Sequence, residues 1–263
     1  MSLRPRPIDA RSAGALGPDG RATASTPPAA RRALDRAAVA GFAVVWTSAL
    51  ARLHSGLFDP DFAAVNLAGV AAGYLLADLV AGIVHWIADR HFDPATPFVG
   101  KLLIEPFRAH HDDPLSITRH DFFEVLGNNA LVAIPATAAL LLVPPPSSAL
   151  AHFGVALALA GTLASVATNL FHGWAHAPRP PRIARWLQAR GLILTPRRHA
   201  LHHRGDHDRA YCVTSGWLNP VLDRTRFFAR LDAWIERGLR PRADRPADPS
   251  GGPSAGREPT VAR

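Results

Sequence analysis

The amino-acid sequence predicts an all-α membrane protein with about four transmembrane helices and a histidine-rich helical cap on the cytoplasmic side. Three observations lead to this prediction. Apolar blocks alternate with polar connections, the arginines avoid two of those connections, and the histidines gather near the ends of the longest blocks. The blocks determine the number of spans, the arginines their orientation, and the histidines the chemistry.

Four apolar blocks occupy the middle of the chain, at residues 37–53, 62–88, 130–143 and 150–171. A helix needs roughly 20 residues to cross the hydrocarbon core of a bilayer, and the second and fourth blocks reach this length. The third block is short enough to be re-entrant unless it begins earlier, within residues 122–126. Three consecutive prolines, residues 144–146, end it and predict a tight turn. We therefore expect the third and fourth blocks to form a helical hairpin.

The two ends of the chain have a different composition. Residues 1–34 and 241–263 are rich in Arg, Pro, Ala, Ser and Gly and show no apolar periodicity. Segments of this kind bury too little apolar surface to order themselves, so we expect two disordered tails. The membrane domain is then predicted to cover residues 35–240.

Basic residues are segregated along the chain. The net charge is +8, and Lys101 is the only lysine. Such a balance suits either nucleic acid or an anionic membrane surface. However, no Lys or Arg occurs between Arg52 and Arg90 or between Arg119 and Arg179. A nucleic-acid-binding stripe would not be interrupted by long uncharged apolar blocks, so we expect a membrane partner and no nucleic acid.

The same segregation predicts the orientation, because positively charged loops are retained in the cytoplasm during insertion. Both tails, residues 89–129 and everything after residue 177 carry the Lys and Arg, whereas the connections 55–61 and 144–148 carry none. With four spans, all the basic segments fall on the cytoplasmic side. This agreement between charge and span parity argues against the alternative of a soluble helical protein with buried helices.

Two histidine motifs coincide with the ends of predicted spans. The fourth block ends in an HxxxH motif that places His172 and His176 one turn apart on one helix face, with Asn169 on the same stripe. The second block ends with His85 four residues before Asp89. An isolated pair at this spacing is weak evidence for a metal site, but clusters on one side of a membrane are strong evidence.

Further histidines lie in the predicted cytoplasmic segments. An HxxHH motif contains His199, His202 and His203, and in a helix the first would face the other two at i+3 and i+4. The complete set of candidate metal ligands is His85, His110, His111, His120, His172, His176, His199, His202, His203 and His207. We interpret His54 and His152 as interfacial or core residues, and leave His91 open.

The residue types restrict the metal chemistry. A single cysteine, Cys212, excludes an internal disulfide, a CxxC zinc site and a cysteine-held iron–sulfur cluster. Any metal must therefore bind imidazole and carboxylate groups. Imidazole suits iron, zinc and copper alike, but eight or more nitrogens exceed what one ion of four to six coordination can use. We therefore expect two ions.

The histidine boxes and the sequence around them resemble a known family. HxxxH followed by HxxHH is similar to the membrane fatty-acid desaturase and hydroxylase superfamily. Residues 106–122, PFRAHHDDPLSITRHDF, resemble its Kua branch, the CarF-like plasmanylethanolamine desaturases. Similar motifs occur at residues 82–89, 168–176 and 214–219, so the resemblance runs from about residue 78 to residue 235. Ala109 and Glu105 depart from the usual pattern, although neither removes a candidate ligand.

The resemblance implies an enzyme that converts a 1-O-alkyl ethanolamine phospholipid into a 1-alkenyl vinyl ether lipid, a plasmalogen. It implies two irons, O2 as co-substrate, and electrons from an outside donor such as a cytochrome b5-like protein or a ferredoxin. Asp89 and Asn169 are the candidate catalytic residues, expected to orient the imidazole rings. The membrane would be a bacterial inner membrane.

Other functions remain open on the sequence. Lipid hydroxylation and ordinary acyl desaturation would use the same histidine boxes. A histidine-rich metal transporter or sensor is a further alternative, but it predicts ligands along a path through the spans, whereas His85 and His172 lie at span ends.

Overall fold

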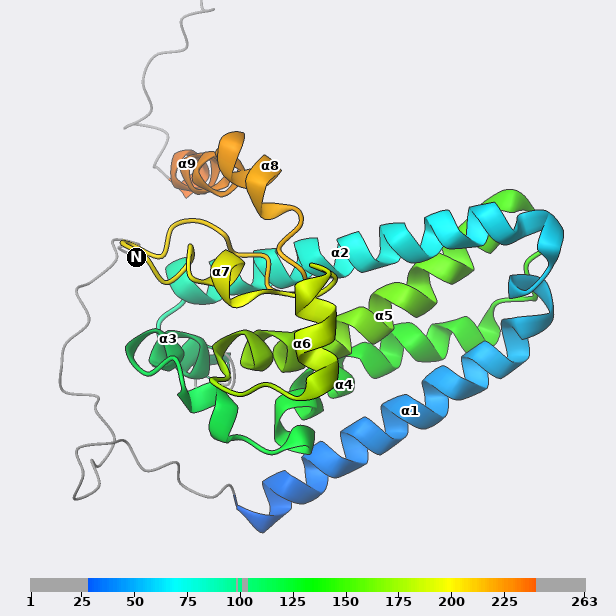
Figure 1. Ribbon diagram of the computed structural model, residues 1–263, viewed down its shortest axis with the longest axis horizontal. Helices are drawn as coiled ribbons and strands as arrows, with labels where there is room; N and C mark the ends of the chain where they lie inside the picture. Colours follow the sequence, from blue (N-terminus) through cyan, green and yellow to red (C-terminus); the bar gives the residue numbers. More distant parts are fainter. Residues whose placement is uncertain (1–27, 98, 101–103, 240–263) are drawn as a thin grey trace, which may run out of the picture.

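The computed structural model describes residues 28–97, 99–100 and 104–239, and within these ranges it contains helices and no strand (Figure 1). Four long helices form a bundle: α1 (Ala29–Leu57), α2 (Ala63–Arg90), α4 (Phe122–Ala139) and α5 (Ala149–His176). The shorter helices are α3 (Glu105–Asp112), α6 (Arg182–Ala189), α7 (Pro196–His199), α8 (Asn219–Arg224) and α9 (Phe227–Leu239). Short 3-10 turns are η2 (Pro60–Phe62), η4 (Ser116–Arg119) and η5 (Leu140–Leu142).

All four predicted spans are confirmed as helices long and apolar enough to cross a membrane. They cover Ala29–His54, Pro60–Arg90, Phe122–Leu142 and Ala149–His176. The third span, whose length was in question, has 21 residues because it begins at Phe122. The Asp121 carboxylate fixes this start by accepting hydrogen bonds from the backbone N–H groups of Phe123 and Glu124. The all-α, four-span fold class is therefore correct.

The predicted boundary of the N-terminal tail needs a correction. Helix α1 begins at Ala29, so residues 29–34 are helical. Arg31 stabilises this first turn: its Nε lies 3.0 Å from a carboxylate oxygen of Asp35, and it donates from a terminal nitrogen to Asn128 Oδ1 of α4 at 2.6 Å. The composition of residues 29–34 resembles that of the tail, so the sequence did not indicate that the helix begins there. Residues 1–27 and 241–263, the rest of the expected tails, lie outside the described residues.

Helices α2 and α5 are the central pair, and small residues let them approach closely. A Cβ atom added at Gly73 would lie 2.2 Å from the Leu157 carbonyl oxygen, and one at Gly69 would lie 2.6 Å from the Phe153 carbonyl oxygen. Membrane helices gain stability chiefly from such packing, because lipid is as apolar as the side chains. The contact fixes the position of the histidine-bearing ends of α2 and α5 relative to each other.

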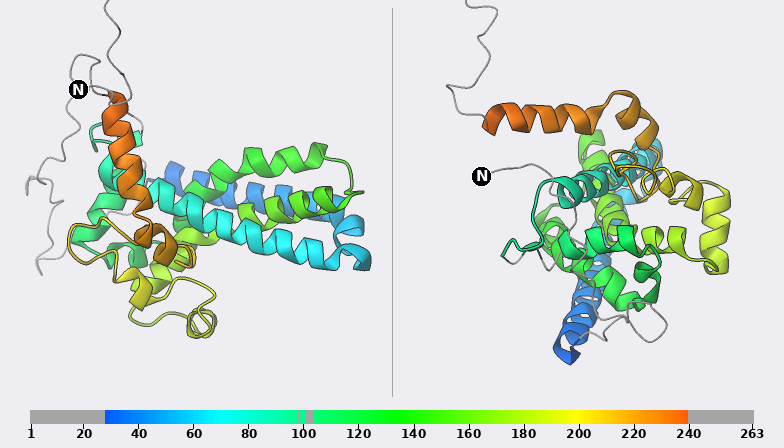
Figure 2. Two further views of the ribbon diagram at one scale, coloured as in Figure 1. Left: turned by 90° about the horizontal axis from the view of Figure 1, so that it is seen from above. Right: turned by 90° about the vertical axis from the view of Figure 1, so that its left-hand side faces the viewer.

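The shorter helices gather at and around one end of the bundle (Figure 2). It is the end at which both α2 and α5 finish, at Arg90 and His176. The opposite end has only short connections, through η2 and η5. The chain therefore builds its ligand-bearing ends and loops at one end of the bundle.

Replacing Gly73 by Ala should destabilise the bundle, because the added methyl group meets backbone atoms of α5 that cannot rotate away. Overpacking of this kind typically costs about 1–3 kcal/mol. Gly154→Ala in α5 is the matched control, since nothing lies within 4 Å of a Cβ atom there. Thermal unfolding of both variants in detergent tests this expectation. Equal stability of the two would contradict the proposed packing.

Candidate metal centre

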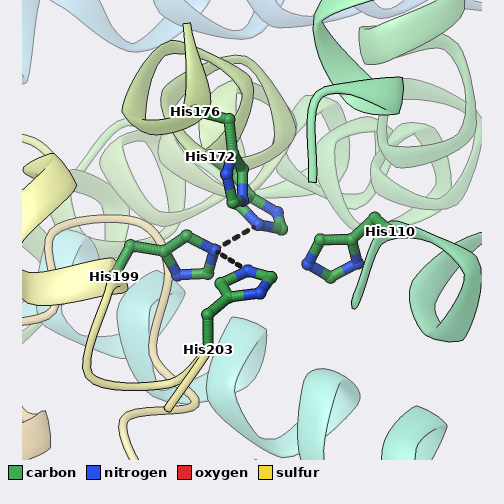
Figure 3. Close-up of side chains that lie close together, drawn as sticks. All are labelled: His110, His172, His176, His199 and His203. Carbon is green, nitrogen blue, oxygen red and sulfur yellow. Dashed lines mark hydrogen bonds between the residues drawn. The ribbon is translucent and has the colours of Figure 1, made fainter. Parts of the chain in front are cut away.

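Five imidazoles form the first ligand group, and Figure 3 shows them converging. The group consists of His110, His172, His176, His199 and His203, whose ligand nitrogens all lie within 4.8 Å of one another. His110 comes from α3, His172 and His176 from α5, and His199 from the end of α7. The Nε2 atom of His199 lies 2.9 Å from both His172 Nε2 and His203 Nε2. This spacing matches nitrogens that share one ion.

The second group adds a carboxylate to three imidazoles. It consists of His85, Asp89, His111 and His202. One Asp89 oxygen lies 3.4 Å from the Nε2 atoms of His85 and His202 and 3.7 Å from that of His111. We expected Asp89 to orient the rings, whereas the structure places it among the possible ligands themselves.

The two groups lie next to each other, because two pairs of adjacent histidines each contribute one residue to the first group and one to the second. His110 belongs to the first group and His111 to the second, with their ring centroids 4.6 Å apart. His203 and His202 divide in the same way. As expected, the ring of His199 lies near both others, with centroids 5.8 Å from that of His202 and 4.6 Å from that of His203. The sequence did not indicate that His202 would join the second group and His203 the first.

Backbone carbonyl groups orient several rings. The Nδ1 atoms of His85, His110 and His202 lie 3.1, 2.6 and 2.8 Å from the carbonyl oxygens of Tyr211, Phe107 and Arg209, respectively. A neutral imidazole that donates its Nδ1–H to a carbonyl presents the Nε2 lone pair on the other side of the ring. These three histidines therefore offer Nε2 to the centre.

Several ring nitrogens and carboxylate oxygens of these two groups have no hydrogen-bond partner although they are buried. They are His85 Nε2, His110 Nε2, His176 Nε2, His199 Nδ1 and both carboxylate oxygens of Asp89. Buried polar atoms without partners are rare, because each loses its hydration without compensation. A bound cation at each group would satisfy most of them, so the residues present fit a metal centre.

Burial also sets the protonation state outside the spans. It lowers the pKa of His110 and of His203 to about 3, with neighbouring imidazoles adding to the effect. Burial likewise lowers the pKa values of His111 and His199 below the usual histidine range. These rings are neutral at physiological pH, and neutral imidazole is the form that binds a metal ion.

Three predicted site residues belong to neither group. The His120 side chain is 42% exposed, and its Nδ1 lies 2.7 Å from a carboxylate oxygen of Glu124. The ring of His207 stacks on that of His111, with centroids 4.2 Å apart, but it belongs to neither group. Asn169 contacts Asn129, with the amide nitrogen 3.4 Å from the acceptor oxygen. This placement does not support His120 as a ligand.

The histidines that we interpreted as core or interfacial, or left open, also lie apart. The His54 Nδ1 lies 2.7 Å from the Ala51 carbonyl oxygen on the exposed surface of α1. His152 is buried near the opposite end of α5, where its ring stacks on Phe62. His91 Nε2 lies 2.9 Å from Asp232. None of them belongs to either ligand group among the described residues.

Asp78 has a role that sequence reasoning did not find. Its carboxylate, seven residues before His85 in α2, accepts hydrogen bonds from the backbone N–H groups of Thr214, Ser215, Gly216 and Leu218. It therefore holds the segment after the HxxHH motif against α2. The sequence showed only an acidic residue within an apolar block, seven positions before His85. It did not indicate that this residue would bind the backbone of residues 214–218.

Comparison with known proteins agrees with this architecture. A family model described as the lipid desaturase domain matches residues 74–244. Over 216 residues the chain is 39% identical to the plasmanylethanolamine desaturase of Myxococcus xanthus, covering 81% of this chain and 75% of that protein. No solved structure gives a significant match.

Two eukaryotic relatives extend the comparison. The mouse protein, plasmanylethanolamine desaturase 1, is 37% identical over 183 residues, covering 67% of this chain and 68% of that protein. The chloroplastic fatty acid desaturase 4 of Arabidopsis thaliana is 35% identical over 199 residues, covering 74% of this chain and 59% of that protein. With its four spans and its histidine groups, the chain belongs to the lipid desaturase family and is an integral membrane desaturase.

Proposed function

We propose that the chain is an O2-dependent diiron desaturase that converts a 1-O-alkyl ethanolamine phospholipid into the corresponding 1-alkenyl plasmalogen. The observation that carries the proposal is the pair of adjoining ligand groups, one of five imidazoles and one of three imidazoles and a carboxylate. The names of the relatives from Myxococcus xanthus and mouse support the choice of substrate.

Iron is the metal that best suits this ligand set and this chemistry. Nitrogen and oxygen ligands without thiolate suit iron, and desaturation needs a redox-active metal. When bound, two irons would supply the oxidising power to remove hydrogen from the unactivated C1–C2 bond of the alkyl chain. Overall, one O2, two electrons and two protons are consumed, the alkyl chain loses two hydrogens, and two waters are released.

The residues of this chain hold, orient and dehydrate the centre. Backbone carbonyls of Phe107, Arg209 and Tyr211 fix the rings of three histidines. His85, His199 and His202 are almost completely buried, which keeps bulk water away from the ligand atoms. The chain carries no NAD or flavin motif, so the electrons come from an outside donor, a cytochrome b5-like protein or a ferredoxin.

We further propose that the protein lies in a bacterial inner membrane with its termini and both ligand groups on the cytoplasmic side. The arginine-free connections support this orientation. A cytoplasmic donor can then reach the end of the bundle at which α2 and α5 finish. His110 and His199 can meet at one centre only if the segments that carry them lie on the same side of the membrane.

Acyl desaturation is a second candidate, because one relative carries the name fatty acid desaturase 4. The two reactions differ in the position of the new double bond. A vinyl ether releases an aldehyde in acid, whereas an acyl double bond is stable there. Lipid analysis therefore separates the two functions.

The deciding experiment expresses the chain in a host that makes 1-O-alkyl ethanolamine lipids but no plasmalogens. We expect acid-labile aldehydes in the lipid extract, and none when His172→Ala is expressed at the same level. Loss of a direct ligand is expected to abolish product formation, since even loss of a supporting residue costs roughly 10–100-fold. New acyl double bonds without aldehydes would favour the second candidate instead.

Metal content should follow the two ligand groups. We expect about two irons per chain from two adjoining ligand groups that each fit one ion. Alanine at His199 or His202 should lower this content. His120→Ala is the matched control, because its imidazole is exposed and pairs with Glu124. Elemental analysis of the purified variants gives the result. Full activity with zinc alone, or with one iron, would refute the diiron proposal.

Topology can be tested by labelling single cysteines in a Cys212→Ser background. Ser147 lies in the arginine-free connection and Ser116 in the segment between α3 and α4. Ser147→Cys should react with an impermeant reagent from outside, whereas Ser116→Cys should react only after permeabilisation, because arginine-rich loops stay in the cytoplasm. The reverse pattern would invert the proposed orientation.

A further inference from the structure

Two irregular segments, residues 190–194 and 213–218, lie side by side against α2. They are joined by a hydrogen bond from the Leu194 N–H to the Thr214 carbonyl oxygen. The Tyr74 hydroxyl of α2 donates to the Leu192 carbonyl oxygen, and the Asp78 carboxylate accepts four N–H groups of the second segment. Their depth along the bundle is therefore set by Tyr74 and Asp78.

The length of α2 determines where those anchors lie in a bilayer. The helix has 28 residues, Ala63–Arg90, and the hydrocarbon core takes up roughly 20 of them. Wherever a window of about 20 residues is placed within α2, it starts no later than residue 71 and ends no earlier than residue 82. Tyr74 and Asp78 are inside the hydrocarbon region in every placement. The segments that they hold must lie at the same depth.

The length of α5 independently places the second segment at hydrocarbon depth. The helix also has 28 residues, Ala149–His176, so a window of about 20 residues always includes residues 157–168. The Thr168 hydroxyl of α5 lies 2.7 Å from the Thr214 hydroxyl. The second segment therefore touches the hydrocarbon-spanning parts of two helices. Tyr74 is 11 positions before His85, which corresponds to about 16 Å along the helix axis.

Non-helical backbone is tolerated at such a depth only when its polar groups are satisfied within the protein. Many polar groups of the two segments have such partners. Besides the four N–H groups on Asp78, the Arg198 guanidinium donates to the carbonyl oxygens of Gly191 and Ser215, and the Trp217 indole N–H donates to Gly191. Gly216 adopts a φ of +70°, which lets its N–H join those of its neighbours in pointing at one carboxylate.

Apart from Arg190, the exposed side chains of the two segments are apolar. Leu192 is 38% exposed and Trp217 is 40% exposed. At the same depth, α2 itself exposes Leu76 and Val80, each to 44%. Helix α6 leads into the first segment and exposes Trp186, over whose ring the Arg190 guanidinium lies at 3.9 Å. Tryptophan and arginine together are typical of the membrane–water interface. Figures 1 and 2 show α6 beside the bundle rather than beyond its end.

We infer that residues 190–194 and 213–218 form a re-entrant membrane element that enters the bilayer beside α2 from the histidine side and contacts lipid through Leu192 and Trp217. Asp78 anchors it. The element returns to the same side, so it does not change the number of spans. Its partner is the hydrocarbon of the surrounding phospholipid, and the inference is independent of the reaction that the histidine groups catalyse.

Spin labels on the full-length protein in nanodiscs of phosphatidylcholine and phosphatidylglycerol test this inference. Leu192→Cys carries the test label, Leu76→Cys the lipid reference, and Arg204→Cys, an exposed position in the loop after the HxxHH motif, the water reference. Cys212 is buried, and burial raises the pKa of its thiol, so the native cysteine stays unlabelled. The readout is the ratio of collision rates with O2 and with a water-soluble nickel chelate, because O2 concentrates in hydrocarbon.

A ratio at Leu192 closer to that at Leu76 than to that at Arg204 is expected, and a ratio closer to Arg204 would overturn the inference. A second sample combines Leu192→Cys with Asp78→Asn, which removes the charged acceptor. Its ratio should shift towards the Arg204 value as the segment leaves the bilayer. An unchanged ratio in a folded variant would show that Asp78 is not the anchor. If the variant does not fold, the three labels in the native background still decide the membrane position.

Discussion

The Asp78 carboxylate is the constraint on which the ligand-bearing half of the structure depends. Four backbone N–H groups from Thr214 to Leu218 converge on it. Hydrogen bonds to a charged acceptor are roughly twice as strong as those between neutral groups. In a buried position, losing the acceptor would also leave four donors unsatisfied. One side chain of α2 thereby holds the end of a segment that supplies three of the nine possible ligands.

The packing of α2 against α5 provides the second requirement, because it aligns ligands from separate spans. Glycine at positions 69, 73 and 161 brings the backbones close along the shared face. At the end of this face, the rings of His85 and His172 have centroids 6.0 Å apart, although they belong to different ligand groups. The separation of the two groups therefore depends on the helix–helix distance as well as on the adjacent histidines that divide between them.

Crowding of buried imidazoles opposes folding in the absence of a cation. Protonation is disfavoured by burial and by the neighbouring rings, as the lowered pKa values of His110 and His203 show. The unpartnered atoms of His85, His176 and Asp89 lose hydration without gaining hydrogen bonds. Most of the buried, unpartnered side-chain atoms of the described residues belong to the two ligand groups, although Asn66 and His152 also have one each. The polar groups of the segments beside Asp78 are largely paired. Such a concentration of unsatisfied polar atoms is typical of a functional centre rather than of a structural core.

The sequence by itself determined the helical class, the four spans and most of the residues that meet at the centre. These features depend on local composition and spacing, such as an apolar run of sufficient length or the HxxxH of His172 and His176, which any helix places on one face. The tertiary structure decided how the ligands divide. Neighbouring histidines such as His110 and His111 point into different groups because of the backbone path between elements distant in the sequence. For the same reason, residue spacing could not show that His120 lies outside both ligand groups or that Asp89 lies among the possible ligands. It also could not identify the backbone groups that bind Asp78.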